Sequence, residues 1–199
     1  MTKSSATRRK GRAGTAVWHS ILDGAENILR DDGYAALSSR NIAERAGVKQ
    51  QLIYYYFHNM DELIVALFRR AADREIQALD RAISSDKPLS NMWEAFTHSQ
   101  DNKLVSEFTA LANRNRHLKS EVIEFIEKMR RRQRVALQRL LGDRPLPLVE
   151  LPLDALVLVA TGLGLVMTRD SELAISKGHA EINRAARSII TALEDTGVS

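Results

Sequence analysis

Arg40, Gln50 and Gln51 are the side chains of this sequence with the most specific hydrogen-bonding chemistry. An arginine can donate two parallel hydrogen bonds to O6 and N7 of guanine, and a glutamine can pair in a similar bidentate way with N6 and N7 of adenine. Between Arg40 and the two glutamines lies Gly47, which permits a tight turn. The pattern therefore favours a surface that reads the edges of base pairs.

The elements that must position these residues are two short helices joined by that turn, and a third helix that follows. Ser38 is a suitable N-cap, and Ile42 and Ala46 lie four apart on one apolar face of a helix that ends at Gly47. Asn59 then caps a helix whose first turn carries two carboxylates, which the helix dipole favours. The side chains left to face outward from the middle helix are Lys49, Gln50, Gln51, Tyr54 and Tyr55.

This segment resembles the helix-turn-helix of the tetracycline-repressor (TetR) family of bacterial transcriptional regulators, over residues 15–68. The family usually has a lysine that touches a phosphate where this chain has Met60, so the resemblance does not extend to that contact with the DNA backbone. The positions that agree in register are Gly33-Tyr34, Ser38, Arg40, Ile42-Ala43, Ala46-Gly47-Val48, Ile53-Tyr54, Phe57, Glu62-Leu63 and Leu67.

The resemblance implies that the chain contacts a double-stranded DNA operator. It places Arg40, Gln50 and Gln51 in the major groove, while Tyr54 and Tyr55 support phosphates or pack on sugars. Simple packing is the alternative role for each tyrosine, and an exposed loop position with no DNA contact is the alternative for His58. The predicted DNA-binding residues are Ser38, Ser39, Arg40, Lys49, Gln50, Gln51, Tyr54, Tyr55 and His58.

The distribution of charge agrees with this interpretation. Residues 1–60 contain nine Lys and Arg against five Asp and Glu, a net charge of +4 that equals the net charge of the whole chain. The positive excess thus lies at the end predicted to meet phosphates. Basic N-terminal segments are also common on proteins that bind no nucleic acid, so the charge supports the prediction only in combination with the helices.

Composition limits the remaining possibilities. With 199 residues, of which 44% are hydrophobic, the chain can bury a real core. It has no cysteine, which excludes disulfides and thiolate metal sites and fits a reducing compartment. No signal peptide is apparent, and the apolar run at 155–168 is too short to span a bilayer, so we expect a cytoplasmic protein without a membrane segment.

The hydrophobic periodicity predicts helices throughout and almost no strand. We therefore expect an all-α fold, with an N-terminal three-helix DNA-binding domain and a C-terminal helical domain for ligand binding and dimerisation. The predicted division is a basic flexible arm at 1–12, the helix-turn-helix domain at 13–60, and the effector-binding and dimerisation domain at 61–199.

The resemblance further implies a small-molecule effector and a homodimer, both in the C-terminal region. An apolar effector is expected, because no cluster of charge marks the predicted pocket, although ordinary core packing is the alternative for each residue. The residues predicted to line the pocket are Met92, Trp93, Phe96, Phe108, Leu111, Phe125 and Met129. The residues predicted at the dimer interface are Ala160, Gly164, Ile182, Ala186 and Ile189.

Catalysis finds little support in the sequence. The five histidines show no metal-ligand spacing and no nucleophile-elbow motif is present, so we expect neither an enzyme nor a metal or cofactor site. The sequence predicts a transcriptional regulator, most simply a repressor released from a palindromic operator by a small molecule. The alternatives are a DNA-binding protein without an effector and a helical protein that binds only small molecules.

Overall fold

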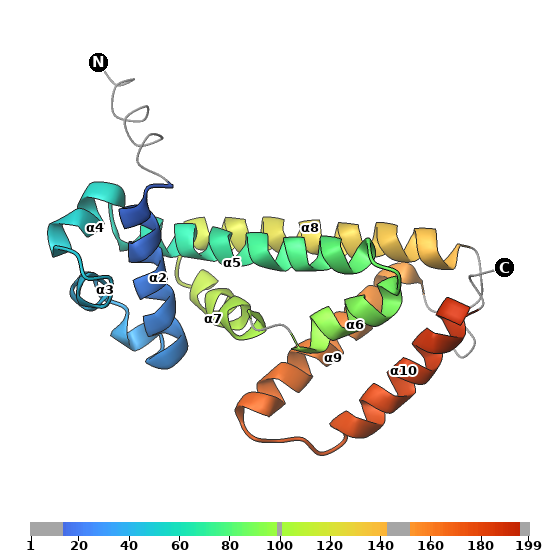
Figure 1. Ribbon diagram of the computed structural model, residues 1–199. Coiled ribbons are helices and arrows are strands. Elements are labelled where there is room, and N and C mark those ends of the chain that lie inside the picture. Colours follow the sequence, from blue (N-terminus) through green and yellow to red (C-terminus); the bar gives the residue numbers. More distant parts are fainter. Residues whose placement is uncertain (1–13, 99–100, 143–151, 196–199) are drawn as a thin grey trace. The chain divides into compact units, whose positions relative to one another are not determined.

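The computed structural model describes residues 14–98, 101–142 and 152–195, and within them it contains helices and no strand (Figure 1). This confirms the predicted all-α class. The segment predicted as a basic arm, 1–12, lies outside the described residues. The elements are α2 (Ala16–Asp31), a short 3-10 helix η1 (Tyr34–Ala36), α3 (Ser39–Arg45), α4 (Gln50–Tyr56), α5 (Met60–Ile83), α6 (Pro88–His98), α7 (Asn102–Ala112), α8 (Arg116–Leu141), α9 (Leu153–Glu172) and α10 (His179–Asp195).

The chain forms two compact units whose boundary differs from the division predicted at residue 60. The first unit ends at Ala71 and also includes Leu104–Val122, and the second comprises Ala72–Lys103 and Ile123–Ser199. Helices α5 and α8 each contribute residues to both units. The boundary falls within α5 because that helix is continuous for 24 residues and buries side chains such as Leu63, Leu67 and Leu79 along its length.

In the first unit, local sequence signals fix the helix-turn-helix. The Ser38 hydroxyl accepts a hydrogen bond from the backbone N–H of Asn41 at 3.2 Å, which confirms the predicted N-cap of α3. Gly47 has a φ of 65°, and this left-handed backbone lets the chain turn between α3 and α4. Ile42 and Ile53, from the two helices, are both almost fully buried. The turn therefore holds α3 and α4 on a shared apolar core.

Helix α2 completes that core by packing closely on the turn. A Cβ atom at Gly24 would lie 3.1 Å from the backbone nitrogen of Ala46, so only a small residue fits between α2 and the end of α3. The Ser20 hydroxyl donates to the Ala46 carbonyl at 3.0 Å and adds a polar contact at the same place. Helices α2 and α3 are thereby joined by direct contacts with the backbone of Ala46, and α3 in turn packs on α4.

The start of α5 is capped as the sequence predicts. The Asn59 side chain accepts a hydrogen bond from the Glu62 backbone N–H at 2.8 Å, and the Glu62 carboxylate accepts one from the His58 backbone N–H at 3.1 Å. Further along α5, Arg70 pairs with Asp23 and Glu26 of α2 at 2.5 and 2.6 Å. Helix α5 is thus joined to α2 by charge-assisted hydrogen bonds.

The second unit is built from α6, α9 and α10 with parts of α5 and α8. Its core joins Leu79, Met92, Leu137 and Val157, which come from four different helices. Helices α6 and α9 pack closely at Gly164, where an added Cβ would lie 2.4 Å from the Phe96 carbonyl oxygen. None of the helices in the described ranges combines the length and the apolar character needed to cross a bilayer.

Candidate nucleic-acid interface and ligand cavity

The predicted DNA-binding residues lie on the outer side of α3 and α4 and in the loop that follows. All of them are exposed except Ser39, whose side chain is buried. Tyr54 and Tyr55 have about half of their surface exposed, 51% and 50%. Large aromatic side chains that are exposed next to each other are typical of a contact surface. The structure brings Ser39, Gln50 and Tyr54 together through hydrogen bonds and leaves the other predicted residues exposed.

Ser39 positions two of these side chains instead of facing outward. Its hydroxyl oxygen accepts hydrogen bonds from the Gln50 side-chain amide at 2.8 Å and from the Tyr54 hydroxyl at 3.0 Å. The bond to Gln50 uses one N–H of the amide and leaves the other N–H and the carbonyl oxygen available. Adenine N7 and N6 pair with one amide N–H and with the carbonyl oxygen, so Gln50 keeps a group of each kind available.

In the described part of the chain, some basic side chains of this surface form ion pairs with carboxylates, and others do not. Arg45 is occupied by Asp31 and Asp32, at 3.1 and 2.9 Å. Arg40 and Lys49 are exposed and form no ion pair within the described residues. An arginine without an acidic neighbour keeps its fork of donors available for guanine or phosphate. The available positive charge therefore lies beside Gln50 and Gln51.

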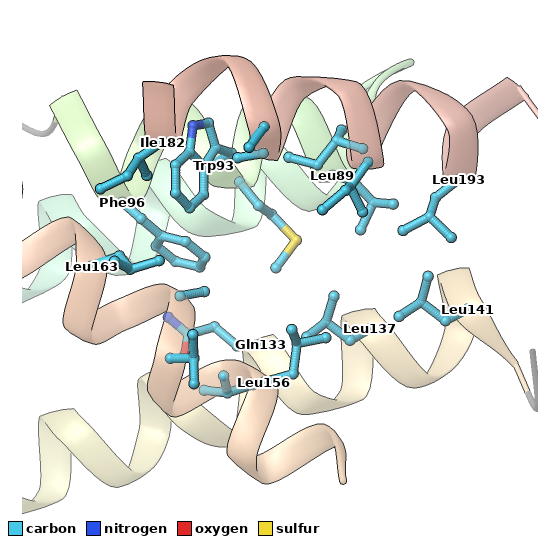
Figure 2. A pocket seen from close by; sticks show the side chains of 18 residues that line it. Leu89, Trp93, Phe96, Gln133, Leu137, Leu141, Leu156, Leu163, Ile182 and Leu193 are labelled. Atoms are coloured by element: carbon cyan, nitrogen blue, oxygen red, sulfur yellow. The ribbon is translucent and has the colours of Figure 1, made fainter. Parts of the chain in front are cut away.

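A second feature is an apolar cavity of about 370 Å³ that lies entirely within the second unit (Figure 2). Its wall is formed by α6, α8, α9 and α10, and Gln133 is the one polar side chain in it apart from the indole N–H of Trp93. That N–H is already bonded to Asn183 at 3.0 Å. The lining residues are Leu89, Met92, Trp93, Phe96, Gln133, Leu137, Leu141, Leu156, Val157, Val159, Ala160, Leu163, Ile182, Ala185, Ala186, Ile189, Ile190 and Leu193.

Some of the residues predicted to line a pocket lie in the wall of this cavity, and others lie elsewhere. Met92, Trp93 and Phe96 lie in the wall of this cavity. Phe108 lies in the first unit, where its ring packs edge-on against Phe68 with centroids 5.4 Å apart. Three others, although apolar, are not among the lining residues: Leu111 lies in the first unit, and Phe125 and Met129 lie in the second unit.

The residues predicted at a dimer interface lie beside the cavity, and all but Gly164 are partly exposed, so their role at an interface stays a prediction. Ala160, Ile182, Ala186 and Ile189 line the cavity, and Gly164 is buried against Phe96. The outer face of α9 instead exposes Leu158, Leu165 and Val166, at 51%, 46% and 43% of their surface. Helix α9 thus also presents an apolar surface to solvent.

Gln133 is the functional candidate that the sequence analysis missed. It lies on α8 four residues after Met129 and three before Ala136, within an otherwise apolar stripe. A polar residue at such a position is a signal for a buried polar group. Among the described residues, no cluster of histidine and carboxylate side chains is arranged to hold a metal ion.

Known proteins resemble this chain both in sequence and in structure. Residues 21–67 match the family model described as bacterial regulatory proteins, tetR family. The fatty acid metabolism regulator protein of Bacillus subtilis is 30% identical over 63 residues, which are 32% of this chain and 32% of that protein. The HTH-type transcriptional regulator EthR of Mycobacterium tuberculosis is 30% identical over 76 residues, 37% of this chain and 35% of EthR. The chain thus spans about a third of the length of these relatives.

Solved structures resemble nearly the whole chain. A TetR transcription regulator from Haloarcula marismortui has a TM-score of 0.66 at 16% identity, covering 91% of this chain and 97% of that one. The multidrug binding protein EbrR, complexed with imidazole, has a TM-score of 0.58 at 21% identity and covers 88% of both chains. At such low identity these likenesses establish the fold, which is an N-terminal helix-turn-helix followed by a helical domain.

Proposed function

We propose that this chain, which belongs to the tetR family of bacterial regulatory proteins, is a homodimeric repressor that a small apolar molecule releases from a palindromic operator. The observation that carries the DNA-binding part is the exposed group of Arg40, Lys49, Gln50 and Gln51 on α3 and α4. The observation that carries the ligand-responsive part is the apolar cavity in the second unit.

Base reading is assigned to Arg40 and Gln50. Arg40 is exposed and has no acidic partner among the described residues, so it can bond O6 and N7 of guanine. Gln50 is held by Ser39 and keeps one amide N–H and its carbonyl oxygen available to adenine. Lys49 is placed to meet a phosphate, which would add affinity without sequence preference. The exposed rings of Tyr54 and Tyr55 complete the contact with the sugar-phosphate backbone.

A second copy of the chain is proposed to bind on the outer face of α9. A palindromic site requires two reading helices about 34–36 Å apart, and therefore a symmetric dimer. Leu158, Leu165 and Val166 form an exposed apolar strip on one side of this helix. Burying such a strip against its symmetry mate removes it from water, which is the usual role of an apolar patch on a protein surface.

Release from the operator is proposed to follow from the ligand's preference for one conformation. A ligand that binds more tightly to a state with a different separation of the two reading helices must, by linkage, weaken DNA binding by the same factor. Helix α5 offers a covalent route for this coupling, because it contributes residues to both units without a break. The similarity to the Bacillus subtilis regulator covers about a third of that protein, so its name does not identify the ligand.

The reading assignment is tested with DNA selected from a random pool by the purified protein. Arg40→Ala and Gln50→Ala are each expected to cost about 1–3 kcal/mol on the selected site and to relax one base preference in each half-site. Arg45→Ala is the matched control, because Arg45 is exposed but paired with Asp31 and Asp32. If Arg40→Ala weakened binding to all sequences equally, Arg40 would be a phosphate contact and the assignment would be wrong.

A further inference from the structure

We propose that the cavity of the second unit takes a neutral, largely apolar molecule that donates one hydrogen bond, from a hydroxyl or N–H group, to the side chain of Gln133. This inference rests on the proposed effector function. It adds the chemical class of the effector and the residue that selects it.

The wall of the cavity excludes a charged ligand. Every lining side chain is aliphatic or aromatic except that of Gln133, and no ionisable side chain is among them. A buried ion without an opposite charge or several hydrogen bonds loses much of its hydration free energy. The indole N–H of Trp93 cannot compensate, because it already donates to Asn183 at 3.0 Å. The occupant is therefore neutral and mostly hydrocarbon.

Gln133 is the polar exception among the lining side chains, and its acceptor oxygen lacks a hydrogen-bond donor within the described part of the chain. The residue is 3% exposed, and its carbonyl oxygen Oε1 is buried without a hydrogen-bond partner among the described residues. Buried polar atoms of this kind are uncommon, because an unpaired acceptor has lost its bonds to water and gained none. The side chain of Gln133 lines the cavity although Oε1 itself is covered, so a rotation of the amide group would let an occupant of the cavity supply the missing donor.

The geometry of Gln133 allows such a contact without a change of fold. Gln133 lies on α8 and its side chain forms part of the wall, together with those of Leu137 and Leu156 (Figure 2). The terminal torsion of a glutamine has a broad energy profile, so its amide group can turn toward a ligand. A hydroxyl group suits this site best, since it donates to Oε1 and can also accept from the amide N–H.

The test compares two isomeric probes of the same formula, 1-decanol and the ether 1-methoxynonane, of which only the alcohol can donate a hydrogen bond. Binding to the full-length protein without DNA is followed by tryptophan fluorescence and by the melting temperature. The wild type is expected to bind the alcohol about tenfold more tightly than the ether, the factor that one hydrogen bond to a buried acceptor gives. Without that bond the order should reverse, because the alcohol loses more hydration when it enters an apolar site.

Two variants assign the preference to Gln133. Gln133→Leu is expected to lose the preference for the alcohol and to bind the ether at least as well as the wild type does. Met92→Leu, which replaces an apolar lining residue with one of similar volume, is expected to keep the preference for the alcohol. If Gln133→Leu does not fold, Gln133→Met replaces it, and the comparison of the two probes on the wild type remains decisive.

The outcomes separate this inference from the proposed function. Equal binding of alcohol and ether by the wild type, an unchanged preference in Gln133→Leu, or no binding of either probe would overturn the inference. Operator release is measured separately with the same probes. Binding that depends on Gln133 but does not release DNA would keep the inference and refute the effector function. Release by both probes alike would support the effector function and refute the role of Gln133.

Discussion

Gly164 is the position where a single methyl group should have the largest effect on the second unit. A Cβ atom there would lie 2.4 Å from the Phe96 carbonyl oxygen, whereas ordinary contact begins near 3.4 Å. Helices α6 and α9 would have to separate by about 1 Å, and the obstructing atom belongs to the backbone, so no side-chain rotation relieves it. We therefore expect Gly164→Ala to destabilise the protein through overpacking, at a cost of about 1–3 kcal/mol.

Gly162 provides the matched control on the same helix. A Cβ atom at Gly162 would meet nothing within 4 Å, so Gly162→Ala should only gain the helix propensity of alanine, about 1 kcal/mol. The propensity gain is common to both variants, so the difference between them measures the overpacking alone. At about 2–4 °C per kcal/mol for a chain of this size, a difference of about 1–3 kcal/mol lowers the melting temperature of Gly164→Ala by about 2–12 °C relative to Gly162→Ala.

The assay is thermal unfolding followed by circular dichroism, repeated at two protein concentrations. The second concentration is needed because Gly162 lies on the helix proposed to carry the dimer interface, and a loss of dimer affinity would depend on concentration. Phe96→Ala added to Gly164→Ala should not restore stability, since the contact is with the Phe96 backbone. Equal melting temperatures for the two alanine variants would refute the close packing of α6 on α9.

Three further predictions concern DNA reading, dimerisation and pH. Ser39→Ala removes the acceptor for Gln50 and Tyr54, so it should cost about 0.5–1.5 kcal/mol on the selected site and have a smaller effect in a Gln50→Ala background, where only the Tyr54 contact is left to lose. A double variant of the exposed strip, Leu165→Glu and Val166→Glu, should yield monomers in light scattering. It should weaken binding to palindromic DNA far more than binding to a single half-site. A dimer that persisted in this variant would contradict the proposed interface. A hydrogen bond from Arg69 holds the pKa of Glu121 below its ordinary value of 4.5, against the opposing effect of partial burial. The stabilisation by this pair should therefore be present above pH 4.5 and fade as the pH falls through the lower, folded-state pKa. Because Arg69 is largely exposed, the difference in stability between the wild type and Glu121→Gln should stay below about 1 kcal/mol; a difference that persisted in strong acid would contradict this account.

The helix-turn-helix could be predicted from the sequence because its signals are local. The cap at Ser38, the turn at Gly47 and the cap at Asn59 depend on residues within a few positions of one another, and all three are present in the structure. The burial of Ile42 and Ile53 follows from the same short-range periodicity. These features do not depend on which distant helix packs against them.

The arrangement of the second unit depends on distant contacts, and periodicity does not specify them. Helix α9 is apolar on both of its faces, so its sequence does not indicate whether Ala160 or Leu165 faces the interior; the structure places Ala160 in the cavity wall and leaves Leu165 exposed. Phe108 and Phe96 are both aromatic residues on short helices, yet they belong to different units. Gln133 was missed because one polar residue scarcely changes the apolar pattern of a long helix.

The proposed function is tested most directly by a competition titration of the purified protein at moderate salt. The competing DNAs are the inverted repeat selected from a random pool and a scrambled duplex of identical composition. The account predicts that the inverted repeat binds at least about a thousandfold more tightly, the lower end of the range for specific recognition, and that binding weakens steeply with added salt. Equal affinity for the two duplexes would contradict the assignment of a base-reading surface to α3 and α4.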